Sequence, residues 1–178
     1  MSGKADHGQF EQRLAEHRRL IAKVASVYAA GAEDRRDLEQ EICVQLWRAY
    51  PGYDERRARF STWLYRIALN VAISHLRREQ GRDAGRLEPL EQHHLDTLSG
   101  EEPPERDERL AALYAFIGQL DPLNRALILL YLEERSYAEI AEVLGITETN
   151  VATKLGRIKQ TLRGRMTASP TERLSAGA

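Results

Sequence analysis

The sequence predicts an all-helical protein with two small helical domains, the C-terminal one a helix-turn-helix, joined by a flexible acidic linker. Apolar residues recur at steps of three and four on both sides of a central stretch, as on the buried face of a helix. The central stretch is acidic, rich in Gly and Pro and poor in apolar residues, which is typical of a flexible linker. A length of 178 residues is enough for two small domains. The expected boundaries are residues 1–80 and 109–166 for the domains, 81–108 for the linker and 167–178 for a disordered tail.

Two amphipathic helices are expected in the N-terminal part of the chain. The first covers residues 9–30 and ends at Gly31. The second opens at Asp34 or Asp37 and ends before Pro51. Its outer face mixes both charge signs, so this face is either simply solvated or a surface for a partner.

An aromatic and basic segment follows, in which Ser61 is expected to cap a third helix. Aromatic rings interleaved with arginines suit single-stranded nucleic acid, because bases stack on the rings while guanidinium groups hold the phosphates. The alternative is that the rings belong to the core. We expect about half of them to be buried, so that core and binding site share this helix. The segment contains Tyr50, Tyr53, Phe60, Trp63 and Tyr65 together with Arg56, Arg57, Arg59 and Arg66.

The C-terminal part contains the pattern of a helix-turn-helix. Ser136 and Glu139 fit a capping box at the start of a short helix, and Gly145 stands where that helix ends in a tight turn. Thr147 or Thr149 then caps the next helix. Two helices from residue 110 to 132, the second starting at Asp121-Pro122, are expected to cover the core of this unit.

The second helix of this unit has one apolar and one polar face. Val151, Leu155, Ile158 and Leu162 form the apolar stripe. The opposite face presents Thr149, Asn150, Thr153, Gly156, Arg157 and Gln160, with Lys154 and Lys159 on its flanks. These side chains suit the major groove, where Arg pairs with guanine, Asn with adenine and lysines with phosphates. The alternative is an ordinary helical hairpin whose polar face is merely solvated.

Charge and composition restrict the classes of function. The net charge is only -1, but residues 48–78 and 154–165 are basic and residues 79–108 between them are acidic, which indicates two contacts with polyanions. Cys43 is the only cysteine, so neither an intrachain disulfide nor a cysteine zinc cluster is expected, and a reduced cytoplasm is the simplest location. No signal peptide is visible, and the longest apolar run, residues 126–132, is too short to cross a bilayer.

Catalytic motifs are missing from the sequence. It contains no nucleophile beside a base, no phosphate-binding glycine loop and no carboxylate pair in an apolar setting. His93 and His94 have no further ligands at zinc spacing. We therefore expect a binding protein without cofactor or metal, and not an enzyme.

Two motifs resemble the extracytoplasmic-function group of bacterial RNA polymerase sigma factors. The first pairs an Asp-Leu-x-Gln-Glu stretch with a Trp-Leu-x-x-Ile-Ala-x-Asn helix, matched here by Asp37, Leu38, Gln40, Glu41, Trp63, Leu64, Ile67, Ala68 and Asn70. The second is the helix-turn-helix, matched by Ser136, Tyr137, Glu139, Ile140, Ala141, Val151, Thr153, Lys154, Leu155 and Arg157. Both motifs occur in the family's order, over roughly residues 10–165.

The resemblance implies a promoter-specificity subunit with three binding surfaces. Residues that would dock on the clamp helices of the largest polymerase subunit are Asp37, Gln40, Glu41 and Trp47. Residues that would open the minus-ten element and hold a flipped base are Phe60, Trp63, Arg66 and Asn70. Residues that would read the minus-thirty-five element are Thr149, Thr153, Lys154 and Arg157. The implied partners are core RNA polymerase at its clamp helices and flap, double- and single-stranded promoter DNA, and an anti-sigma factor.

The chain departs from the family pattern at Arg35, Arg36, Cys43, Ser74 and Ala152, so its promoter sequence does not follow from the family.

A stand-alone helix-turn-helix regulator is the alternative function. Such a protein would need a dimer interface to match two half-sites, and neither a heptad repeat nor an exposed apolar helix indicates one. Two small domains on a loose linker are also expected to share few contacts.

Overall fold

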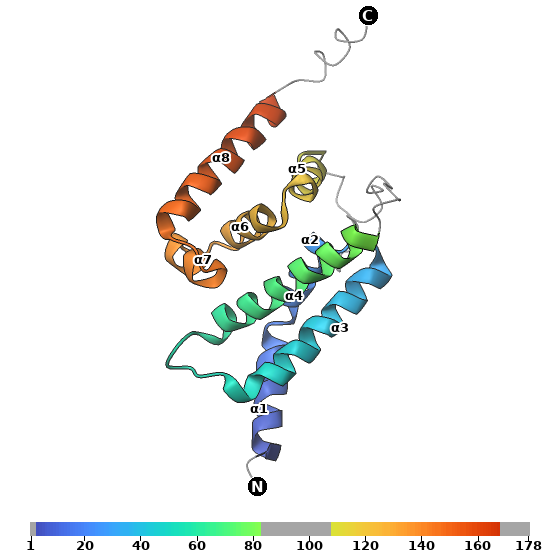
Figure 1. Cartoon of the computed structure of the whole chain (residues 1–178), viewed down its shortest axis with the longest axis vertical. Helices are drawn as coiled ribbons and strands as arrows, with labels where there is room; N and C mark the ends of the chain where they lie inside the picture. Colours follow the sequence, from blue (N-terminus) through green and yellow to red (C-terminus); the bar gives the residue numbers. More distant parts are fainter. Residues whose placement is uncertain (1–2, 83–107, 168–178) are drawn as a thin grey trace, which may run out of the picture.

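The computed structural model describes residues 3–82 and 108–167, and every regular element within these two stretches is helical (Figure 1). The predicted all-helical fold is therefore confirmed. Most of the predicted linker, the predicted tail and the two adjacent histidines lie outside the described residues. The elements are α1 (Gly3–Glu16), α2 (Arg18–Tyr28), α3 (Ala32–Ala49), the 3-10 turn η1 (Tyr50–Gly52), α4 (Phe60–Arg82), α5 (Glu108–Gln119), α6 (Pro122–Leu132), α7 (Tyr137–Leu144) and α8 (Glu148–Thr167).

Helices α2, α3 and α4 pack on one another around an apolar core. The apolar face of the amphipathic helix α3 lies against this core, because Leu38, Ile42 and Leu46 are fully buried. Leu64 and Ala68 of α4 are fully buried as well. No described helix is long and apolar enough to cross a bilayer.

The prediction of one continuous helix over residues 9–30 is wrong, because the chain turns at His17 between α1 and α2. The backbone N–H of His17 donates to the carbonyl of Leu14 at 3.1 Å, which is the spacing of a tightened last turn. Its ring Nδ1 donates to the Arg13 carbonyl at 2.8 Å, and the ring packs edge-on against Phe60. A contact with a residue distant in sequence thus interrupts a helix that periodicity alone would continue.

Two helices begin earlier than predicted. The carbonyl of Gly31, an extended residue, accepts the first hydrogen bond of α3 from Arg35 at 2.9 Å, so α3 starts at Ala32 and not at an aspartate. The acidic side chains Glu33 and Asp34 then fall in the first turn, where the helix dipole favours negative charge. Likewise α4 starts at Phe60, ahead of the serine expected to cap it.

The local signals of the C-terminal part are confirmed. Asp121 caps α6 by accepting from the backbone N–H of Asn124 at 3.0 Å. Ser136 and Glu139 form the capping box of α7, with bonds of 3.2 and 2.9 Å in the two directions. The backbone N–H of Ser136 holds the pKa of Glu139 below its ordinary value. Gly145 ends α7 in the left-handed conformation with φ of 67°.

Replacing Ser136 by alanine is expected to lower the free energy of unfolding by about 1 kcal/mol, because an early N–H of α7 loses its acceptor. Thermal unfolding followed by circular dichroism measures this loss. Ser74→Ala is the matched control, since Ser74 is exposed inside α4 and has no capping role. Equal unfolding temperatures for wild type and S136A would show that the capping box contributes nothing to stability.

The two helical halves pack against each other, contrary to the expectation that they share few contacts. Helix α4 lies against α6 and α7, and α2 lies against α5 and α6 (Figure 1). The hydroxyl of Tyr28 on α2 donates to the carbonyl of Pro122 at 2.7 Å, and Arg125 of α6 donates to the Val27 carbonyl at 3.3 Å. Burial raises the pKa of Tyr28 well above its ordinary value. Sequence patterns gave no sign of these contacts because they join residues about a hundred positions apart.

Candidate functional site

Helix α8 turns its apolar stripe inward and a polar face outward. Val151 and Leu155 are fully buried, while Thr149, Asn150 and Arg157 are exposed. The helix is capped by Thr147, whose hydroxyl oxygen accepts from the backbone N–H of Asn150 at 3.2 Å, and this settles which of the two predicted threonines is the cap. The long polar side chains of the outer face are therefore presented from a well-anchored helix.

The predicted minus-thirty-five residues lie on this helix, but they differ in exposure and in whether their polar groups are already bonded within the helix. The hydroxyl of Thr153 donates to the carbonyl of Thr149 at 2.9 Å, so its proton is already held within the helix. Lys154 is half-buried and Arg157 is exposed. Asn150, which the sequence-based set omits, is exposed and lies seven residues before Arg157. Seven residues are about two helical turns, so the two side chains lie above one another on the same edge of the face.

Gly156 lies in the middle of the exposed face of α8, where an added Cβ would meet nothing within 4 Å. Replacing it by alanine is expected to raise the free energy of unfolding by about 0.5–1 kcal/mol, because glycine loses more backbone entropy in a helix than alanine does. Chemical denaturation measures this gain. Gly81→Ala, near the end of α4, is the control. It should raise the free energy of unfolding by less than G156A does, since helix ends fray. A destabilised G156A would contradict the open environment of this residue.

The aromatic residues predicted for the minus-ten element form one cluster at the start of α4. Trp63 lies 5.0 Å from Tyr53 and 5.3 Å from Phe60, measured between ring centroids. Phe60 is buried, whereas Trp63, Tyr53 and Tyr50 are half-buried. The core and the accessible part of the cluster thus share the same helix, as the sequence suggested.

Basic side chains border this cluster. Arg56, Arg57 and Arg59 of the loop before α4 are more than four-fifths exposed, at 89, 88 and 83%. Arg56 binds both carboxylate oxygens of Asp54 at 3.0 Å, and this bond lowers the pKa of Asp54. Arginines with this exposure are accessible to phosphates.

The remaining predicted minus-ten residues lie on the outer surface of α4. Asn70 is exposed. Arg66 is exposed too, but its guanidinium donates to the backbone carbonyl of Glu142 in α7 at 2.9 Å. Arg66 therefore contacts the other half of the molecule in this structure.

The predicted polymerase-binding residues lie on α3, and two of them contact other parts of the protein. Asp37 and Gln40 are exposed, and Trp47 is 43% exposed with its edge against Phe10. Glu41, in contrast, accepts two bonds of 2.8 Å from Arg78 of α4. This carboxylate joins α3 to α4, a role that the sequence did not indicate.

The charge departures on α3 are not equivalent. Arg35 is buried at 7% exposure, and its Nε donates to the Gly31 carbonyl at 3.4 Å. Arg36 is exposed. Only the second arginine therefore adds positive charge to the outer surface of α3.

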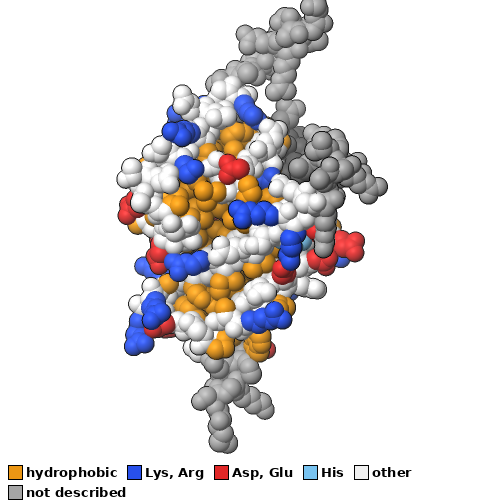
Figure 2. All heavy atoms as spheres, in the orientation of Figure 1, with side chains coloured by type: hydrophobic (Ala, Val, Ile, Leu, Met, Phe, Trp, Pro, Cys, Tyr) orange, Lys and Arg blue, Asp and Glu red, His pale blue; other side chains and the backbone are white. Residues whose placement is uncertain are grey.

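Exposed apolar side chains lie on both halves of the molecule. Figure 2 shows apolar atoms gathered in two areas of one face, one over the half with α5 to α8 and one over the half with α1 to α4. The large exposed apolar residues in the described part of the chain are Val44, Trp47, Tyr131 and Leu132. The last two end α6; Leu132 had been expected to cover the helix-turn-helix core, and it is 48% exposed instead.

Family comparisons agree with this division of the molecule. Residues 14–82 match the family described as Sigma-70 region 2, and residues 110–162 match Sigma-70, region 4. The RNA polymerase sigma-H factor of Pseudomonas aeruginosa is 30% identical over 168 residues, which cover 89% of this chain and 86% of that protein. The chain belongs to the extracytoplasmic-function sigma factors. In this sigma factor, region 2 comprises α2 to α4 and region 4 runs from α5 into α8.

Other relatives of the sigma factor support the same assignment. SigE of Mycolicibacterium smegmatis is 31% identical over 160 residues, and the chain covers 60% of its length. The solved structure of CnrH in complex with the cytosolic domain of CnrY has a TM-score of 0.64 and 27% identity, covering 94% of this chain and 92% of that chain. RpoE of Bartonella quintana, solved with the anti-sigma factor NepR, shares the fold with a TM-score of 0.70 at 17% identity, covering 90% and 98%.

Proposed function

We propose that this sigma factor binds core RNA polymerase through α3, opens the minus-ten element with the aromatic cluster of α4, and reads the minus-thirty-five element with α8. The observation that supports this most is the outer face of α8, which carries exposed Asn150 and Arg157 on a helix that begins right after a tight turn. In helix-turn-helix proteins the N-terminal residues of the second helix contact base edges in the major groove.

Base reading at the minus-thirty-five element would rest on two side chains. Arg157 can bond both acceptors of a guanine edge, and Asn150 can pair with adenine. Thr149 and Thr153 would add close contacts, and Lys154 would approach a phosphate. Because Ala152 has no polar side chain where the family pattern noted above often has a basic one, Asn150 and Arg157 would determine most of this chain's preference.

Opening of the minus-ten element would use the half-buried ring of Trp63, supported by Phe60 from the core side. A flipped base costs a few kcal/mol to extrude, and stacking on an aromatic ring returns about 1–3 kcal/mol. Asn70 can bond an exposed base edge, and the loop arginines can hold the displaced strand. Arg66 would join them once it is released from α7.

Polymerase binding would use two apolar surfaces. On α3, the exposed Trp47 with Asp37 and Gln40 would meet the clamp helices, while Glu41 would keep α3 in register with α4. At the end of α6, Tyr131 and Leu132 would meet the flap. Exposed apolar residues of this size are typical of protein interfaces.

An anti-sigma factor is a further expected partner, since both solved relatives are bound to a partner protein, one of them named an anti-sigma factor. The sigma factor would act in the cytoplasm, where the polymerase is. It would supply binding energy and positioning, while the polymerase carries out the chemistry. No residue is therefore assigned a catalytic role.

Run-off transcription tests the proposal. Core RNA polymerase is incubated with and without the protein on a pool of the source organism's promoters at modest salt, because phosphate contacts weaken steeply with salt. Transcripts from defined start sites that require the protein are expected, and they would also give the promoter sequence. Absence of such transcripts, together with specific binding of a duplex by the protein alone, would favour a stand-alone regulator.

A further inference from the structure

Helix α1 packs on the aromatic cluster at the start of α4, although the family match begins only at residue 14. We infer that Arg13 of α1 is a positioning residue for promoter opening: it holds the loop of residues 53–59 and the rings of the cluster in the arrangement that receives an extruded base. This inference rests on the proposed function and adds to it a residue from outside the matched region 2.

Arg13 contacts both the loop and the cluster. Its guanidinium carbon lies 5.7 Å from the centroid of the Tyr53 ring and 5.5 Å from that of the Phe60 ring. An arginine within about 6 Å of a ring centroid is attracted by the negative face of the ring. The same guanidinium pairs with the carboxylate of Glu55 in the loop. One side chain of α1 thus connects a loop carboxylate with two rings of the cluster.

Neighbouring contacts hold Arg13 itself in place. Its backbone carbonyl accepts from the ring of His17 at 2.8 Å, and that ring packs on Phe60 with 5.1 Å between the centroids. Phe10 lies three residues before Arg13, which places both on one face of the helix. Phe10 is buried, and its ring centroid lies 4.8 Å from that of Tyr50. Helix α1 is therefore anchored to the cluster on both sides of Arg13.

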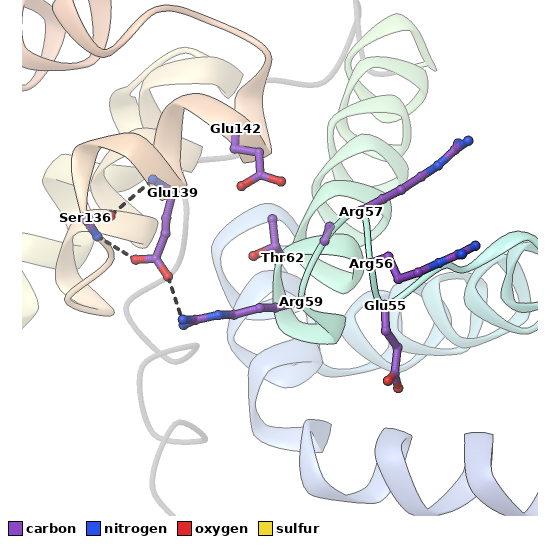
Figure 3. Close-up of a pocket in the computed structure, with 9 residues that line it drawn as sticks. Glu55, Arg56, Arg57, Arg59, Thr62, Ser136, Glu139 and Glu142 are labelled. Carbon is purple, nitrogen blue, oxygen red and sulfur yellow. Dashed lines mark hydrogen bonds and ion pairs between the residues drawn. The ribbon is translucent and has the colours of Figure 1, made fainter.

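The environment of Arg13 differs from that of the loop arginines. Its side chain is 23% exposed, whereas those of Arg56 and Arg57 are 89% and 88% exposed. Figure 3 shows Glu55 extending from the loop in a different direction from Arg56 and Arg57. The pair between Glu55 and Arg13 thus ties the loop to α1 without covering the arginines that DNA phosphates would meet. Arg13 acts on the loop and the rings, and not on the DNA.

A fixed loop favours opening because the surface that receives the base is then already formed. The hydroxyl of Tyr53 donates to the carbonyl of Ala58 at 3.1 Å, which joins this ring to the far end of the loop. The Tyr53 ring lies 5.0 Å from Trp63, the residue proposed to stack on the base. When a binding arrangement is populated only part of the time, the apparent affinity falls by that fraction. Arg13 raises the fraction by holding Glu55 and the Tyr53 ring.

The first test replaces Arg13 by glutamine in the full chain bound to core polymerase. Promoter opening is followed by 2-aminopurine fluorescence in the minus-ten element, and affinity is measured for a single-stranded minus-ten oligonucleotide. Both are expected to fall about threefold to tenfold, because the ion pair and the contacts with the rings are lost. Closed complexes on duplex DNA should form as with wild type. Arg13→Lys keeps a cation beside the rings and should retain most of the opening activity.

Glu55→Gln gives the sharper result, because charge and positioning predict opposite signs. Removing a carboxylate from a basic loop would strengthen DNA binding if charge alone decided the effect. Since Glu55 holds the loop to Arg13, E55Q is instead expected to open the promoter about twofold to fivefold less than wild type. The Glu55 side chain is 62% exposed, so the change leaves the core intact. Glu11→Gln makes the same charge change on the exposed side of α1 and should leave opening unchanged.

Salt dependence separates positioning from a direct phosphate contact. For single strands, the logarithm of the affinity falls with the logarithm of the salt concentration by roughly 0.7 per neutralised phosphate. R13Q should keep the wild-type slope, because Arg13 contacts the protein and not the strand. A slope shallower by roughly 0.7 in R13Q, or opening in E55Q equal to or above that of wild type, would overturn the inference. So would a lowered unfolding temperature of R13Q with closed complexes and opening lost to the same extent.

Failure of this inference differs from failure of the proposed function. If wild type, R13Q and E55Q open the promoter equally, the protein is a sigma factor whose opening step does not depend on Arg13. If wild type bound to core polymerase opens no promoter, the proposed function fails, and the inference that rests on it fails as well.

Discussion

Replacing Trp63 by alanine is expected to reduce promoter opening about tenfold to a hundredfold and to leave binding of core polymerase nearly unchanged. The factor corresponds to the loss of about 1–3 kcal/mol of stacking between the indole ring and an extruded base. Trp63 packs against Tyr53 and Phe60 and is only half-buried, so part of the ring is accessible to a base. Fluorescence of 2-aminopurine in the minus-ten element, with the promoter found by run-off transcription, measures opening directly.

The control for Trp63 is phenylalanine, which keeps a stacking surface in the same place. W63F should retain most of the opening activity. Both variants, bound to core polymerase, should form closed promoter complexes on duplex DNA as readily as wild type does. Because W63A also removes packing from the cluster, its unfolding temperature is measured beside the opening signal. If duplex binding and opening fall together in W63A, the ring has a structural role and receives no base.

Local signals allowed the helix-turn-helix to be predicted well. A capping box, a left-handed glycine and an apolar stripe act within a few residues of one another, so the sequence alone determines them. Ser136, Gly145 and Leu155 all lie as predicted. The residues on the outer face of α8 could be predicted too, because burying the apolar stripe of a helix leaves the opposite face exposed.

Contacts between distant residues could not be predicted in the same way. The break at His17 depends on Phe60, and the orientation of Glu41 depends on Arg78. Neither pair is adjacent in sequence, and both residues of each pair also have plausible roles on a surface. The burial of Arg35 in α3 is a similar case: arginine is usually exposed, and only packing against neighbouring helices reveals where its side chain lies.

The packing of α4 on α7 shows that a residue predicted from sequence to bind DNA can have a partner within the protein. Arg66 has the residue type and position expected of a promoter contact, and the structure gives it a protein partner. Both assignments hold if the two contacts alternate, one in the free protein and one on DNA. The residue type and position of Arg66 therefore do not by themselves distinguish a promoter contact from a contact within the protein.

Replacing Arg157 by alanine is expected to lower transcription from the protein's own promoter by about tenfold to a hundredfold, with little effect on stability. A two-pronged bond from arginine to guanine contributes about 1–3 kcal/mol of discrimination between bases. Arg157 is exposed on α8, so its truncation should change the free energy of unfolding by no more than about 0.5 kcal/mol. Run-off transcription on the natural promoter and on single-base variants of its minus-thirty-five element measures both the loss and its specificity.

The base dependence is the decisive part of the Arg157 experiment. R157A should lose discrimination at one base pair and keep it at the others, since a base contact acts at one position while a phosphate contact acts on all sequences alike. Arg19→Ala removes the same charge from the exposed side of α2 and should leave transcription unchanged. Uniform weakening across all promoter variants would place Arg157 on a phosphate, and base reading at this element would then fall to Asn150, the other long polar side chain on the same edge of α8.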